Sequence, residues 1–178
     1  MKKMLAAALT ILSLALPISA MGSSEEPSQE TGPMIVREGH DFALLRGTDI
    51  VSEEVLGAAY LRNSTVTLIN IWTTSCPACI RKMPDLAELQ EILPEGAAIL
   101  GIVLDGSNRS SMVLEILEAY NITFPNIVPH SSMQELLHRT APYIPATVLV
   151  DSSGGIISGP HYGLKDIQEY LSEIYRHL

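Results

Sequence analysis

Apolar residues beyond about residue 35 occur in two patterns. Some form short, nearly continuous runs such as Val66 to Trp72, which is typical of a strand covered on both faces of a sheet. Others recur every three or four residues, which predicts helices with one apolar face. The expected strands span residues 41–45, 66–72, 97–104, 146–150 and 156–157. The expected helices span residues 77–93, 111–120, 131–139 and 164–178.

Strand-like and helix-like segments alternate along most of the chain. This order predicts an α/β fold in which a central mixed β-sheet with parallel inner strands is flanked by helices. The hairpin expected over residues 146–157, with its Gly-rich turn, makes the sheet mixed, and a short N-terminal strand or hairpin extends it. We expect one domain over residues 35–178, which is long enough for a sizeable core.

The first 20 residues have the pattern of a secretory signal peptide. Lys2 and Lys3 precede an apolar segment over residues 4–16, and a small-residue cleavage site follows. An uncleaved membrane anchor is the alternative, although the apolar run is shorter than the roughly 20 residues that a spanning helix needs. Residues 21–34 are polar, acidic and rich in Ser, Gly and Pro, which predicts a flexible tether. We therefore expect export to the periplasm.

The chain is acidic, with 11 Lys and Arg against 20 Asp and Glu and a net charge of −9. Removal of residues 1–20 would take away two lysines and no acid, so the exported chain would be more acidic still. An acidic chain without a basic run is a poor candidate for binding nucleic acid or an anionic membrane surface.

The only two cysteines, Cys76 and Cys79, lie in the segment WTTSCPACIRKMP. The predicted strand ends just before them, so Cys76 falls at a helix N-cap and Pro77 at the first helical position, where proline is favoured. Backbone amides of the first turn and the positive end of the helix would stabilise a thiolate on Cys76. A thiolate attacks disulfides, and Cys79 is spaced to resolve the mixed disulfide that forms. The pair therefore predicts thiol–disulfide exchange.

Three other uses of the cysteines compete with this interpretation. A structural zinc site needs four ligands, but the five histidines are scattered along the chain. An inert disulfide would close so short a loop that it would add little stability. A peroxidase of the peroxiredoxin kind needs a proline seven residues before its cysteine, where Ile69 stands. We therefore favour no metal and no cofactor beyond the redox-active disulfide itself.

Two blocks of sequence carry a resemblance. Residues 66–84 contain a strand followed by Trp-x-x-x-Cys-x-x-Cys and Met-Pro, and residues 144–151 read IPATVLVD. These resemble the thioredoxin superfamily, and most of all its extracytoplasmic TlpA- and ResA-like thiol–disulfide oxidoreductases, whose second block holds a cis-proline loop. The resemblance covers about residues 35–178 and implies a thioredoxin-like fold.

The resemblance also implies roles for individual residues. Cys76 would be the nucleophile and Cys79 the resolving thiol. Pro145 would follow a cis peptide bond and pack against the pair, while the Ile144 backbone would pair with an extended substrate segment. Trp72 would flank the site, unless it only packs in the core.

The activity implied by the resemblance is reduction of disulfides in exported proteins, apocytochrome c among the candidates. A membrane thiol transporter of the DsbD or CcdA type would supply the electrons. We expect the protein to act as a monomer.

Three positions depart from the pattern of that family. Ser75 stands where tryptophan is usual, Ile80 where a basic residue is common, and Lys82 where glutamate is common. A lysine three residues past Cys79 would lie near it on a helix, stabilise the thiolate and make the pair more oxidising. The alternative is that Lys82 extends into solvent, where salt screens it.

A binding module is the rival of the enzyme. A thioredoxin-like domain could deliver copper through Cys76, Cys79 and a histidine such as His161. Copper-delivery proteins of that fold typically separate their cysteines by three residues rather than two, which favours the enzyme.

Overall fold

The computed structural model describes residues 41–178. The predicted signal peptide, the predicted tether and the expected start of the domain at residue 35 lie outside the described residues. No helix within residues 41–178 has the length and apolar character needed to cross a membrane.

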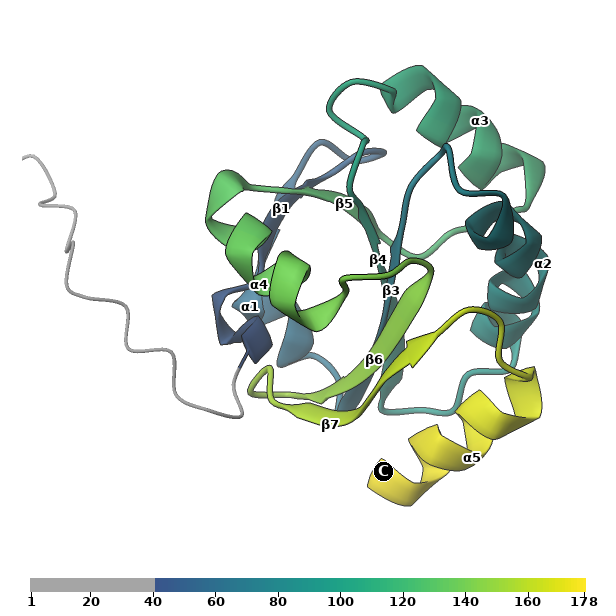
Figure 1. Cartoon of the computed structure of the whole chain (residues 1–178). Coiled ribbons are helices and arrows are strands. Elements are labelled where there is room, and N and C mark those ends of the chain that lie inside the picture. The colour runs from purple at the N-terminus through teal and green to yellow at the C-terminus, as the bar shows by residue number, and fades with distance from the viewer. Residues whose placement is uncertain (1–40) are drawn as a thin grey trace, which may run out of the picture. The chain divides into compact units, whose positions relative to one another are not determined.

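A seven-stranded mixed sheet forms the centre of the domain, in the order β2-β1-β5-β4-β3-β6-β7 (Figure 1). β3, β4 and β5 run parallel, whereas β1–β2 and β6–β7 pair in antiparallel fashion. The predicted mixed sheet with parallel inner strands is thereby confirmed. The strands are β1 (Arg46–Asp49), β2 (Val55–Gly57), β3 (Val66–Trp72), β4 (Ala97–Val103), β5 (Asn126–Pro129), β6 (Ala146–Asp151) and β7 (Ile156–Tyr162).

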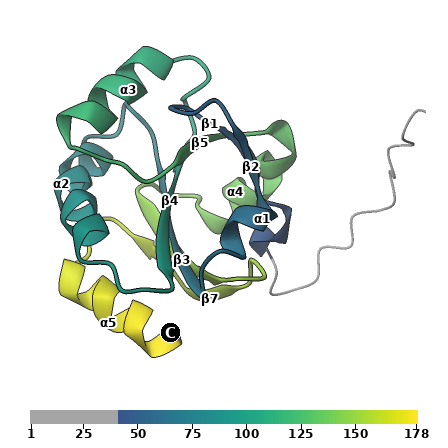
Figure 2. The ribbon, with the colours of Figure 1, turned by 180° about the vertical axis from the view of Figure 1, so that it is seen from behind.

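Helices cover both faces of this sheet. α2, α3 and α5 lie over one face and α1 and α4 over the other, as the two opposite views show (Figures 1 and 2). The helices are α1 (Ala58–Leu61), α2 (Pro77–Glu91), α3 (Ser110–Ala119), α4 (Gln134–Thr140) and α5 (Ile167–His177), with 3-10 helices η1 (Asp41–Leu44) and η2 (Ser131–Met133).

The core is divided into two apolar layers by β3, whose seven residues are all buried. Leu68 and Trp72 pack in the layer beneath α2, α3 and α5, and Ile69 and Ile71 pack in the other layer. Burial on both faces explains the continuous apolar run in the sequence, because neither set of alternating side chains meets water.

The strand predicted over residues 41–45 is wrong, because this segment forms the 3-10 helix η1 and the residue after it. The Leu45 amide donates to the Phe42 carbonyl at 2.9 Å, and both side chains are buried. Two buried residues three positions apart suit a helical turn, whereas a half-buried strand buries alternate residues. The N-terminal hairpin is present, but it is formed by β1 and β2.

Candidate redox site

The cysteine pair lies where β3 gives way to α2. Cys76 is the N-cap of α2, with extended backbone angles of φ −99° and ψ 104°, and Pro77 opens the helix. The Cys79 amide donates to the Cys76 sulfur at 3.1 Å. The two cysteines form a disulfide with their Cα atoms 5.2 Å apart. The predicted N-cap is confirmed, and with it one donor that would stabilise a Cys76 thiolate.

The two sulfurs differ in accessibility. Cys76 is half-buried, whereas Cys79 is 1% exposed and belongs to the core beneath α2. The residue expected to be the nucleophile is thus the more accessible of the two, although it is half-buried rather than open to solvent. A nucleophile must reach a partner's disulfide, while a resolving thiol needs only to reach the nucleophile.

Asp105 holds the loop that precedes Cys76. It follows β4, and its carboxylate accepts the Thr74 amide at 3.0 and 3.1 Å and the Thr74 hydroxyl at 2.6 Å. Arg109 lies 3.8 Å from the same carboxylate. The parallel strands β3 and β4 end at one edge of the sheet, so a polar residue after each could have been expected to meet there. Sequence reasoning missed this contact.

The Ile144–Pro145 peptide bond is cis, as predicted. Ala146 pairs with Ile71 across β6 and β3, so Pro145 lies beside the end of β3 from which the Cys76 loop departs. Ile144 is half-buried and packs against both layers of the core. The proline loop and the cysteine loop therefore share one edge of the sheet, and a role for the Ile144 backbone in substrate binding stays a prediction.

Trp72 is a core residue rather than a contact surface. Its side chain is 0% exposed, and its indole nitrogen donates to the Asn126 side-chain oxygen at 3.1 Å. Asn126 fits against Gly101 of β4, where any Cβ atom would overlap the Asn126 side chain. Of the two predictions for Trp72, the structure therefore favours core packing.

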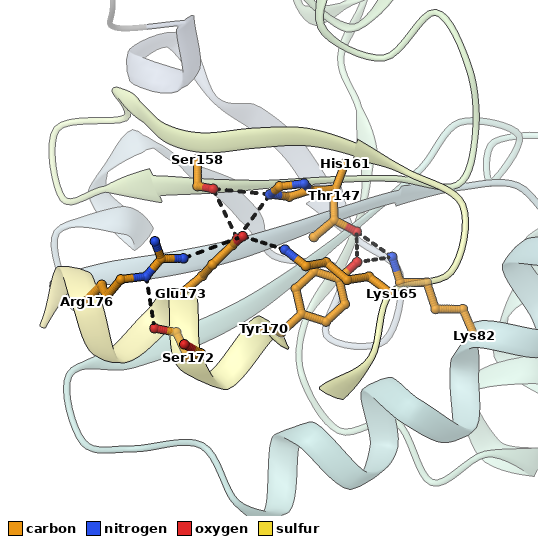
Figure 3. Close-up of polar contacts among 9 residues, drawn as sticks. All are labelled: Lys82, Thr147, Ser158, His161, Lys165, Tyr170, Ser172, Glu173 and Arg176. Carbon is orange, nitrogen blue, oxygen red and sulfur yellow. Dashed lines mark hydrogen bonds and ion pairs between the residues drawn. The ribbon is translucent and has the colours of Figure 1, made fainter. Parts of the chain in front are cut away.

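Lys82 is buried, and the prediction that it extends into solvent is wrong. Its side chain is 1% exposed, and its ammonium group donates to the Thr147 hydroxyl at 2.5 Å and the Tyr170 hydroxyl at 2.8 Å (Figure 3). Burial lowers the pKa of Lys82 to about 8, with nearby Lys165 adding to the effect and Asp85 opposing it. Burial also raises the pKa of Tyr170 to about 12.

The histidine named for a copper site is engaged elsewhere. His161 lies 3.0 Å from the Glu173 carboxylate and 3.1 Å from the Ser158 hydroxyl, as Figure 3 shows. Within residues 41–178, no three or more His, Cys, Asp or Glu side chains gather in a group that could hold a metal ion. The site geometry therefore supports sulfur chemistry at Cys76 and Cys79.

The sequence matches a known protein family and is similar to individual proteins. The sequence pattern of the AhpC/TSA family matches residues 37–158. The thiol-disulfide oxidoreductase ResA of Geobacillus kaustophilus is 29% identical over 151 residues, which cover 83% of this chain and 82% of that protein. ResA of Geobacillus thermodenitrificans is 29% identical over 110 residues, which cover 60% of this chain and 61% of that protein.

Solved structures share the fold. A thiol:disulfide interchange protein of the thioredoxin family from Chlorobium tepidum superposes with a TM-score of 0.63 at 18% identity, covering 74% of this chain and 91% of that one. StoA from Bacillus subtilis superposes with a TM-score of 0.56 at 21% identity, covering 74% and 95%. These likenesses establish the thioredoxin-like fold that the sequence blocks implied.

Proposed function

The chain belongs to the AhpC/TSA family, and we propose that it is a thiol–disulfide oxidoreductase acting through Cys76 and Cys79. One observation carries the proposal. The half-buried Cys76 sulfur at the N-cap of α2 accepts a hydrogen bond from the backbone amide of Cys79, its buried disulfide partner. Relatives named thiol-disulfide oxidoreductase ResA give it further support.

The reaction follows from the two environments. The Cys76 thiolate attacks one sulfur of a substrate disulfide, and the other substrate sulfur leaves as a thiolate. Cys79 then loses its proton and attacks the Cys76 sulfur, which re-forms the Cys76–Cys79 disulfide and releases the second substrate thiolate. The substrate gains two electrons and, once both thiolates are protonated, two protons. The positive end of α2 and the Cys79 amide favour the thiolate form of Cys76.

Substrate binding is assigned to the edge of the sheet that holds the cysteine and proline loops. The loop at Ile144 and Pro145 lies beside the end of β3, and an extended segment of substrate would pair with its backbone. The main feature supporting this role is the position of the loop, one strand away from the reacting sulfurs.

The proposed substrates are disulfides of exported proteins, with apocytochrome c as one candidate. The signal-peptide pattern of residues 1–20 supports a periplasmic location. Electrons would come from a membrane thiol transporter of the DsbD or CcdA type, and the protein would work as a monomer. The family resemblance alone supports these finer assignments.

Trapping of mixed disulfides tests the proposal. Cys79→Ser should accumulate covalent adducts with disulfide-containing proteins, because nothing resolves the bond to Cys76. Cys76→Ser is the matched control and should accumulate none. Adducts with Cys76→Ser alone, or consumption of hydrogen peroxide by the wild-type dithiol without any adduct in Cys79→Ser, would contradict the proposal.

A further inference from the structure

Lys82 is a buried cation without an acidic partner. Among residues 41–178, no carboxylate forms an ion pair with its ammonium group. Its two hydrogen-bond acceptors, Thr147 and Tyr170, are neutral hydroxyls. A charge removed from water costs much free energy unless a compensating charge or hydrogen bonds offset it. The position of Lys82 therefore calls for a functional explanation.

The surroundings of Lys82 form a buried polar cluster beneath α2, made of Lys82, Asn70, Thr147 and Tyr170. Asn70 and Thr147 are paired residues of β3 and β6. Asn70 lies between Leu68 and Trp72 on the side of β3 that faces α2, and it is 1% exposed. Its side-chain oxygen has no hydrogen-bond partner within the described part of the chain. An ammonium group has three donors, so the cluster holds a spare acceptor and a spare donor.

This cluster lies close to the redox pair. Lys82 follows Cys79 by three positions on α2, and residues so spaced are neighbours on one helix face, about 5–6 Å apart at Cβ. Both side chains are 1% exposed, and Cys79 and Tyr170 belong to one apolar cluster. Thr147, which accepts from Lys82, lies two residues after Pro145, at the start of β6.

We infer that Lys82 is the buried counter-charge of the reduced cysteine pair, and that it holds its proton more tightly once the disulfide is reduced. This inference rests on the proposed function of Cys76 and Cys79. Lys82 would not react itself but would act on the two sulfurs through its charge.

Reduction of the cysteine pair changes the charge near Lys82. Two electrons from a dithiol donor break the Cys76–Cys79 bond, Cys79 binds one proton, and Cys76 remains a thiolate. In the disulfide form no negative sulfur is present, and burial holds the pKa of Lys82 at about 8. A thiolate nearby favours the ammonium form. The fraction of Lys82 that is neutral in the disulfide form, a minority below pH 8, therefore binds a proton on reduction.

No other charged group near Lys82 in the described part of the chain is in a position to serve as the counter-charge of the cysteine pair. Lys165 and Arg176 lie 2.5 and 3.7 Å from the Glu173 carboxylate, so this acid is already paired with cations. Asp85, one turn along α2, acts on Lys82 at longer range. The charged groups that act on Lys82 or on its partner Tyr170 are Asp85 of α2, Lys165 before α5, and Glu169 and Glu173 of α5, and His161 of β7 contacts Glu173.

The pKa of Lys82 in each redox state tests the inference without any substitution. Full-length protein with lysine labelled at Cε can be titrated by NMR in its disulfide and dithiol forms. We expect the acid dissociation constant of Lys82 to fall at least tenfold on reduction. Equal constants in the two forms would overturn the inference.

The redox potential gives a second test. Equilibration with glutathione should show that Lys82→Met is more reducing than wild type by at least tenfold in the exchange constant, which is about 30 mV for two electrons. Lys165→Met is the matched control, because Lys165 also lies near the Tyr170 ring but is paired with Glu173, and it should change the potential much less than Lys82→Met does. An equal shift in both variants, or none in Lys82→Met, overturns the inference. Failure of the wild type to exchange at all contradicts the proposed function instead.

Discussion

Replacement of Lys82 by Met should stabilise the oxidised protein at neutral pH. The substitution keeps an unbranched side chain of similar length and removes the charge. Burial lowers the pKa of Lys82 from 10.5 to about 8, so the charged form is disfavoured in the folded state. At about 1.4 kcal/mol per pKa unit, this costs the wild type about 3 kcal/mol at pH 7.

The lost hydrogen bonds oppose part of this gain. Thr147 and Tyr170 still bond to each other through their hydroxyl groups at 3.1 Å, so removal of the ammonium group costs about 1 kcal/mol. Lys82→Met should therefore be about 2 kcal/mol more stable than wild type at pH 7.

The effect should depend on pH in a defined window. Between pH 8 and 10.5 the unfolded chain binds more protons at Lys82 than the folded chain does, so wild-type stability rises with pH there. Below pH 8 the full penalty applies, and above 10.5 it is gone. At pH 10 only about 1 kcal/mol of the penalty remains, and the two proteins should be equally stable.

Urea unfolding of the oxidised proteins at pH 7 and pH 10 measures this difference. Lys165→Met is the control and should show no such gain, because its ammonium group is ion-paired with Glu173. A Lys82→Met protein that is less stable than wild type at pH 7, or a difference that does not change with pH, would refute the reasoning.

Three further predictions concern the redox site and the residues that support it. Asp105→Ala should lower the free energy of unfolding by about 2–3 kcal/mol, measured by thermal unfolding, because it removes the charged acceptor of Thr74. Arg109→Ala removes only an exposed partner at 3.8 Å and should stay within about 0.5 kcal/mol of wild type. Equal losses in the two variants would argue against the role of Asp105. Trp72→Phe should lower the free energy of unfolding by about 1–3 kcal/mol, since it leaves the Asn126 oxygen without its indole donor. An unchanged stability would contradict this. Purified protein analysed for metals should carry less than one zinc or copper per chain, and tight stoichiometric copper that needs Cys76 would support the copper-delivery alternative.

The central strand and the cysteine helix could be predicted from the sequence because their causes are local. The apolar run of β3 has the bounds predicted for it, Val66–Trp72. The start of α2 is determined by two adjacent residues, since Cys76 is the N-cap and Pro77 is the first helical residue. The short strand β5 could not be predicted, since four residues ending in proline carry little pattern and owe their pairing to β4 and β1.

The environment of Lys82 lay beyond sequence reasoning. A lysine is normally exposed, so its place on a helix near Cys79 left solvent as a reasonable alternative. Its burial depends on Thr147 and Tyr170, which are 65 and 88 positions away along the chain. The apolar periodicity of the last helix did not indicate that Tyr170 is buried, and only the packing of α5 against the sheet face covered by α2 brings these groups together.

The relative reactivity of the two sulfurs tests the central claim most directly. The reduced wild-type protein would be treated with iodoacetamide at several pH values. The rate of alkylation of each cysteine would be measured by peptide mass spectrometry. Cys76 should react first, with a pKa below the usual value of about 8.5, because it is half-buried at the helix N-cap. Faster alkylation of Cys79, or a Cys76 that titrates at or above 8.5, would contradict the account.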